Sequence, residues 1–130
     1  MFERLASEDF AYLTTTGRRT GRPHRIEIWF ALRDGRIYLL SGGGDRADWV
    51  RNIRKDGHVR VQVGSRSVAA RAHIARAGAE DQRARELLDE KYMGWMAGRR
   101  LSSWARGATP VVIELPRRPT ARGPAARAPR

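Results

Sequence analysis

Residues 24–44, HRIEIWFALRDGRIYLLSGGG, decide the fold of this chain. In the first half, Ile26, Ile28 and other apolar residues alternate with polar ones, which is the pattern of a strand with one buried face. Asp34-Gly35 is the strongest short signal for a two-residue hairpin turn. A second strand follows at 36–40 and stops at Ser41 and three glycines. The stretch therefore predicts an antiparallel hairpin that ends in a glycine-rich bend.

The remaining chain adds strands of the same kind and a few helices. Four further stretches carry β-branched or alternating apolar residues: 11–16, 58–64, 67–76 and 109–115. Helical spacing predicts helices after Asp45, ended by Gly57, and over 79–96, with short ones near 2–8 and 101–104. Because most strands are joined by short connections, neighbouring strands should be antiparallel. We predict an α+β, mainly β, fold: a six-stranded antiparallel barrel with two or three flanking helices.

Length and composition narrow the class of protein. The chain has 130 residues, which fit one domain at 1–115 followed by a disordered tail at 116–130 that is rich in arginine and proline. It has no cysteine, so disulfide scaffolds and thiolate sites are excluded. It also lacks an apolar run of ~20 residues and a signal peptide, so we expect a cytoplasmic protein without a membrane span. The net charge of +12 favours an anionic partner.

The loop between the first two predicted strands is a candidate anion site, and we call residues 16–25 the arginine loop. Guanidinium groups bind phosphate and carboxylate in a bidentate manner, and glycines let the backbone approach a ligand closely. A solvated basic loop with no ligand is an equally good interpretation of the composition alone. The four arginines are Arg18, Arg19, Arg22 and Arg25.

A second candidate is the glycine bend, residues 41–44. Its glycines expose main-chain donors next to the start of the following helix, where an anionic or planar ligand can lie. A flexible connection is the alternative. In that helix, Asn52 carries both donor and acceptor groups and would be unusual in a purely structural position. By spacing alone, Trp49 and Ile53 are core residues.

The histidines and the late aromatic residues are two further groups of side chains with the chemistry of a site. The histidines lie in separate predicted strands without a repeated short spacing, so no metal site is predicted. The late aromatic residues are most simply core residues, although they can also wall a substrate pocket. They are Tyr92, Trp95 and Trp104.

Several of these stretches together resemble the deazaflavin-dependent nitroreductase family. They are 12–23, YLTTTGRRTGRP; 34–43, DGRIYLLSGG; 49–53, WVRNI; and 58–64, HVRVQVG. The resemblance extends over about residues 10–115 and implies a split β-barrel that binds coenzyme F420. It further implies that the arginine loop holds the phosphate and acidic tail of the coenzyme, through Arg18, Arg19, Thr20, Gly21, Arg22 and Arg25. The contacts to the ring implied in the same way are Ser41, Gly42, Gly43, Trp49, Asn52 and Ile53.

The resulting hypothesis is an F420-dependent oxidoreductase. Reduced deazaflavin would give a hydride to an electron-poor acceptor such as a quinone, an enone or a nitro compound, with Ser41 or Tyr92 as proton donor. The alternatives are a barrel that binds FMN, a barrel that binds a cofactor, lipid or tetrapyrrole without turnover, and a nucleic-acid-binding barrel. Against nucleic acid, the aromatic residues do not alternate with basic ones along a strand. The hypothesis leaves open whether the chain forms a homodimer.

Overall fold

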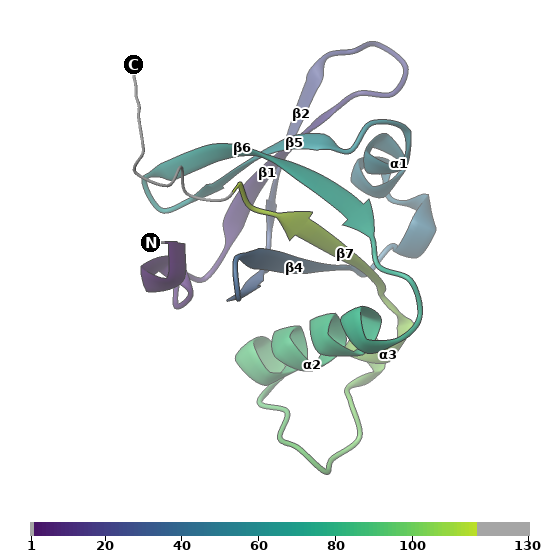
Figure 1. Ribbon diagram of the computed structural model, residues 1–130. Coiled ribbons are helices and arrows are strands. Elements are labelled where there is room, and N and C mark those ends of the chain that lie inside the picture. Colours follow the sequence, from purple (N-terminus) through teal and green to yellow (C-terminus); the bar gives the residue numbers. More distant parts are fainter. Residues whose placement is uncertain (1, 117–130) are drawn as a thin grey trace.

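The computed structural model describes residues 2–116 as a curled sheet with helices on two sides (Figure 1). The strands are β1 (Ala11–Thr16), β2 (Pro23–Ile28), β3 (Ala31–Arg33), β4 (Arg36–Ser41), β5 (His58–Val63), β6 (Arg66–Ile74) and β7 (Thr109–Glu114). The helices are η1 (Phe2–Leu5), η2 (Gly44–Arg46), α1 (Asp48–Lys55), α2 (Ala79–Met93) and α3 (Ser103–Gly107). Apart from Pro116, the tail for which disorder was predicted lies outside the described residues.

All neighbouring strands are antiparallel, in the order β2-β1-β5-β6-β7-β4-β3. The predicted hairpin is confirmed: Arg33 pairs with Arg36, and the turn residues Asp34 and Gly35 have φ of 54° and 76°. Positive φ at both central positions is the geometry that matches the twist of two antiparallel strands. The main prediction of an antiparallel, mainly β half-barrel with flanking helices is therefore correct.

The sheet has seven strands where six were predicted, because the expected strand at 24–33 is two strands. It breaks at Trp29 and Phe30, and its halves, β2 and β3, form opposite edges of the sheet. At the break, the backbone of Phe30 is bonded to side chains of α2. Its N–H donates to the hydroxyl of Tyr92 (3.0 Å), and its carbonyl accepts from Nζ of Lys91 (3.0 Å).

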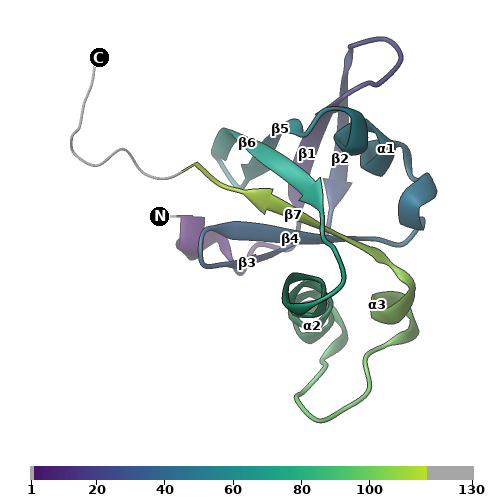
Figure 2. The same cartoon turned by 45° about the vertical axis from the view of Figure 1, so that its right-hand side comes forward.

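Two apolar cores lie on the two faces of this sheet. The barrel core is closed by α1, and its largest side chains include Leu13, Phe30 and Ile37. The second core lies between the outer face of the sheet and α2 and α3, around Tyr38 and Leu88. Figure 2 shows α2 and α3 together on that side, beneath β4. Because β4 is covered on both faces, its residues from Ile37 to Ser41 are all buried, without alternation.

Several helix boundaries differ from the predictions: α3 is Ser103–Gly107 where 101–104 was expected, and η1 ends at Leu5. Asp45 does not cap α1; it lies in η2, and its carboxylate accepts from the hydroxyl of Thr109 (2.8 Å). At the other end of the chain, α2 stops at Gly94, whose φ of 75° gives a left-handed end, so Trp95 is outside the helix. No helix within residues 2–116 is long and apolar enough to span a bilayer.

Candidate functional site

The arginine loop is a tight turn built on its two glycines. The N–H of Gly17 donates to the carbonyl of Arg22 (2.7 Å), and the N–H of Gly21 donates to the carbonyl of Gly17 (2.8 Å). A Cβ on Gly17 would lie 3.0 Å from the Arg22 oxygen, and Gly21 has a φ of 74°. The hydroxyl of Thr20 accepts from the N–H of Arg22 (3.2 Å) and is part of the same turn.

Arg18 and Asn52 form a clasp between this loop and α1. The Oδ1 of Asn52 accepts from the N–H of Arg18 (3.1 Å) and from its Nη1 (3.0 Å), and Nδ2 donates to the hydroxyl of Thr15 (3.0 Å). The guanidinium of Arg18 also pairs with Asp48 (3.2 Å). Asn52 is only 1% exposed. The donor and acceptor groups of Asn52, which suggested a contact with a ligand, are therefore hydrogen-bonded within the protein. The guanidinium of Arg18 is likewise bound by protein groups.

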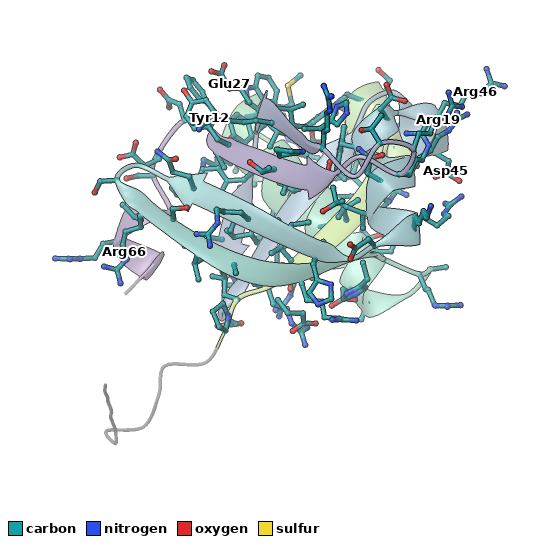
Figure 3. The ribbon with its side chains drawn as sticks, turned by 90° about the horizontal axis from the view of Figure 1, so that it is seen from above. Tyr12, Arg19, Glu27, Asp45, Arg46 and Arg66 are labelled. Carbon is teal, nitrogen blue, oxygen red and sulfur yellow. The ribbon has the colours of Figure 1, made fainter. Side chains whose placement is uncertain are left out.

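The other arginines of the loop make no contact in this clasp. Arg19 and Arg22 are exposed, and within residues 2–116 their side chains make no hydrogen bond or ion pair. The guanidinium of Arg25 lies over the ring of Tyr12, 4.4 Å from its centre. Figure 3 shows Arg19 at the same end of the molecule as Asp45 and Arg46, far from Arg66. Arg19 and Arg22 are thus the loop side chains best placed to receive an anion.

The glycine bend follows β4 and is closed by a side chain. The hydroxyl of Ser41 donates to the carbonyl of Gly44 (2.9 Å), and Ser41 is buried. Gly42 and Gly43 are exposed, and Gly44 has a φ of 65°. Since the hydroxyl of Ser41 is oriented into the turn, the open surface of the bend is formed by the glycine backbone.

The arginine loop and the glycine bend are both attached to α1. The clasp ties the loop to the helix, and Arg54 of α1 pairs with Asp45 at the end of the bend (3.5 Å). Figures 1 and 2 both show the loop after β1 on the side of the molecule where α1 lies. The other predicted ring contacts on α1 are less open: Ile53 belongs to the barrel core, and Trp49 packs partly against it.

Next to the bend stands a cluster of rings that we call the aromatic wall: Trp29, Tyr92 and Trp104. A Cβ on Gly42 would lie 3.6 Å from Nε1 of Trp104. Trp29 meets Trp104 edge-on (5.5 Å between centroids) and is stacked on Tyr92 (4.3 Å, 1° between planes). Trp29 is 44% exposed, an unusual position for a large apolar ring. Trp29 is not among the predicted site residues.

The hydroxyl of Tyr92 is hydrogen-bonded to the backbone of the protein, so its proton is not free. Its hydroxyl accepts from the N–H of Phe30, and its single hydrogen faces the carbonyls of Asp9 (2.7 Å) and Phe30 (3.0 Å). Burial raises the pKa of Tyr92, and the Asp9 carboxylate adds to that rise, while the hydrogen bond from Phe30 opposes it. The hydroxyl hydrogens of both predicted proton donors, Ser41 and Tyr92, are therefore directed to backbone carbonyls.

The short helix α3, which carries Trp104, is clamped at both ends by α2. At its start, the carboxylate of Asp89 accepts from the N–H (2.8 Å) and the hydroxyl (2.6 Å) of Ser102, which caps α3. At its end, Nη1 of Arg85 donates to the carbonyls of residues 105, 106 and 108 (2.6, 2.9 and 2.9 Å). Arg85 is itself held by Asp81 (2.7 Å). The position of Trp104 thus depends on these α2 side chains.

One cluster of side chains has the composition of a metal site. His73, Glu80 and Glu114 place ligand atoms within 4.8 Å of one another. However, the guanidinium of Arg36 donates to both carboxylates, at 3.1 Å and 3.3 Å. The positive charge of this guanidinium therefore already offsets part of the negative charge of the two carboxylates.

The curled antiparallel sheet, with helices packed on both faces, is a split β-barrel. Solved structures of this shape include an F420-H2-dependent reductase, FDR-A (18% identity, 82% of this chain and 94% of that one, TM-score 0.64). Another is a conserved hypothetical protein of Mycobacterium tuberculosis (21% identity, 85% of this chain and 74% of that one, TM-score 0.65). A third is an FAD-binding protein of Mesorhizobium loti (17% identity, 88% of this chain and 86% of that one, TM-score 0.60). At these identities the likeness concerns the fold alone.

Residues 2–116 match the model of the F420H(2)-dependent quinone reductase family, and the chain belongs to this family. It is accordingly an F420-dependent oxidoreductase whose cofactor is coenzyme F420. The predicted cofactor and reaction type are confirmed, and the family match favours the deazaflavin over FMN.

Proposed function

We propose that the chain binds reduced F420 along α1 and reduces a quinone that lies against the aromatic wall. The observation that carries the proposal is the exposed backbone of Gly42 and Gly43. A Cβ on Gly42 would lie 3.6 Å from the ring of Trp104, and one on Gly43 would lie 3.6 Å from Ala47, which directly precedes α1. A flat cofactor can lie against a backbone without side chains, and a flat acceptor can stack on an exposed indole.

The residues present fit such a cofactor. Among the described residues, Arg19 and Arg22 are exposed cations without a hydrogen-bond or ion-pair partner, so both are available to its anionic groups. The glycine bend supplies an open surface that a Cβ would fill, since one on Gly43 would reach to 3.6 Å from Ala47. In this proposal Arg18 and Asn52 position the loop and do not touch the coenzyme themselves.

When bound, reduced F420 supplies a hydride, which together with one proton converts a quinone to its hydroquinone. The protein's part is to hold both planes and to keep water from the barrel-facing side. Ser41 and Tyr92 each direct their hydroxyl hydrogen to a backbone carbonyl, so we assign the proton to solvent at the exposed side of Trp29.

Binding and turnover test this proposal separately. We expect the full-length protein to quench F420 fluorescence, with weaker binding of FMN and of a random oligonucleotide. Arg19→Ala should raise the Kd of F420 about tenfold, the effect of losing one charge-assisted hydrogen bond of ~1.5 kcal/mol. The matched control Arg100→Ala removes one exposed arginine of the 94–102 loop and should leave Kd within twofold.

Turnover is then followed by oxidation of reduced F420 in the presence of menadione, cyclohexenone or a nitroimidazole. Menadione should be reduced fastest, and Trp29→Ala should raise its KM several-fold without changing the Kd of F420. Equal rates with wild-type and Trp29→Ala protein would remove the aromatic wall from the acceptor site. Tighter binding of FMN than of F420 would contradict the cofactor part. Light scattering on the same sample measures whether the chain pairs into a homodimer.

A further inference from the structure

A basic hollow of about 740 Å³ opens at the C-terminal end of α1, between that helix and the last residues of β6. Its size is that of a small-molecule site. Four cations line it, Arg54 and Lys55 from α1 and Arg71 and Arg76 from β6 and the residues that follow. None of the residues that line the hollow is acidic.

The hollow exists because two backbones meet at its floor without side chains. The N–H of Ala72 donates to the carbonyl of Gly57 (2.7 Å), and a Cβ on Gly57 would lie only 2.6 Å from the Ala72 oxygen. Ala72 and Ala75 add no bulk to this floor. In Figure 1 the arrow of β6 ends below α1, and residues of both elements line the hollow.

Most of this positive charge has no carboxylate partner. Arg54 pairs with Asp45 at 3.5 Å, but both side chains are more than half exposed, where such pairs are weak. Nζ of Lys55 donates to the backbone carbonyl of Arg18 (2.9 Å). Among the described residues, Arg76 has no hydrogen-bond or ion-pair partner.

Arg71 is held in position by a relay of two further side chains. Oδ1 of Asp56 accepts from the N–H (3.0 Å) and from Nδ1 (2.9 Å) of His58. Nδ1 therefore carries the hydrogen, and Nε2 of His58 accepts from Nη1 of Arg71 (2.9 Å). In the pairing of β6 with β7, Glu114 lies opposite Arg71, and its carboxylate, like that of Glu80, is engaged by Arg36. Arg71 is thus oriented without being neutralised directly.

The negative end of the α1 dipole accounts for two of these cations but not for all four. Arg54 and Lys55 occupy the last turn of α1, where basic residues stabilise a helix. Arg71 and Arg76 lie outside α1, so the preference for basic residues in the last turn of a helix does not account for them. Like charges gathered around one hollow repel one another, and an anion in the hollow relieves that repulsion.

We propose that this basic hollow binds a ligand that carries several phosphate or carboxylate groups close together. Such a group can be the acidic end of the coenzyme or a separate polyanion, and the chemistry of recognition is the same. The proposal does not rest on the acceptor or on hydride transfer, because binding of a polyanion is measured without F420.

Inorganic tripolyphosphate is the probe, titrated calorimetrically into the full-length protein at low salt. Arg76→Glu is the principal variant, because Arg76 makes no contact that folding needs; Arg71→Ala with Arg76→Ala is the second. We expect each to weaken tripolyphosphate binding at least tenfold, while Arg99→Ala with Arg100→Ala, which removes the same charge as Arg76→Glu, changes Kd by less than twofold.

An equal loss of tripolyphosphate affinity in the control and the test variants would show that only net charge matters and would overturn the proposal. Equal affinity of wild type and Arg76→Glu would also overturn it. A repeat with saturating F420 separates the two sources of the anion. Displacement of tripolyphosphate supports the coenzyme's own acidic end as the occupant, and unchanged binding supports a separate polyanion.

Discussion

Gly57 stands at the closest approach of two backbones among the described glycines, and its replacement tests that contact. Gly57→Ala places a Cβ 2.6 Å from the backbone oxygen of Ala72, which cannot move without breaking β6. We expect the free energy of unfolding to fall by about 1–3 kcal/mol, as for an overpacked core. Gly107→Ala is the control, because no atom lies within 4 Å of its added Cβ. Urea denaturation measures both variants, and equal stability of the two would contradict the prediction.

Lys91 makes the stability of the protein depend on pH in the alkaline range. Burial lowers the pKa of Lys91 from 10.5 to about 8, against the opposing influence of Asp9 and Glu8. Between these two values the unfolded chain binds the proton and the folded protein does not, so stability rises with pH from about 8. Above about pH 10, the raised pKa of Tyr92 acts in the opposite direction.

Urea denaturation at one pH below 8.5 and one above it measures the free energy of unfolding and checks the prediction for Lys91. Lys91→Met should flatten the rise in stability that the wild type shows, since the variant has no ammonium to deprotonate. Lys55→Met, which removes an exposed lysine of α1, should keep the rise. An unchanged rise in Lys91→Met would assign the pH dependence to other groups.

At the scale of elements, the clamp on α3 links α2 to the aromatic wall. Arg85→Met removes three hydrogen bonds to the carbonyls at the end of α3 and the ion pair with Asp81. We expect a stability loss of about 1.5–3 kcal/mol and faster amide exchange in α3. Because α3 carries Trp104, the KM for menadione should rise while the Kd of F420 stays within twofold.

Arg83→Met is the matched control for the clamp. Arg83 lies on the same helix, but its partner Asp34 is 70% exposed, so the pair contributes little. The control should preserve stability, amide exchange in α3 and the KM for menadione. If Arg85→Met weakened F420 binding as much as acceptor binding, α3 would belong to the coenzyme site instead.

At the scale of the whole molecule, the charge of +12 should act on association with the coenzyme. A basic protein attracts an anion over a distance set by the Debye length, so added salt slows association. Raising salt from ~0.05 M to ~0.5 M should lower the on-rate for F420 several-fold in stopped-flow fluorescence. The KM for menadione should not change with salt, because menadione is uncharged. An on-rate for F420 that ignores salt would show that capture is not electrostatic.

The local sequence determined the elements and the chemistry available in the loops. Asp34-Gly35 gave the hairpin, alternation gave β5 and β6, and helical spacing gave α2, because each of these signals acts between neighbouring residues. The arginine loop and the glycine bend were likewise identifiable from composition, and the family resemblance supplied the cofactor.

Only the tertiary structure decided where those pieces meet. The strand at 24–33 broke because Tyr92 and Lys91, some sixty residues away, bond the backbone of Phe30. Arg18 and Asn52 bind each other instead of facing solvent, and Trp104 reaches Gly42 because α2 clamps its helix. Such contacts depend on hydrogen bonds and packing between distant segments, whose partners are set by the closure of the sheet and carry no local pattern.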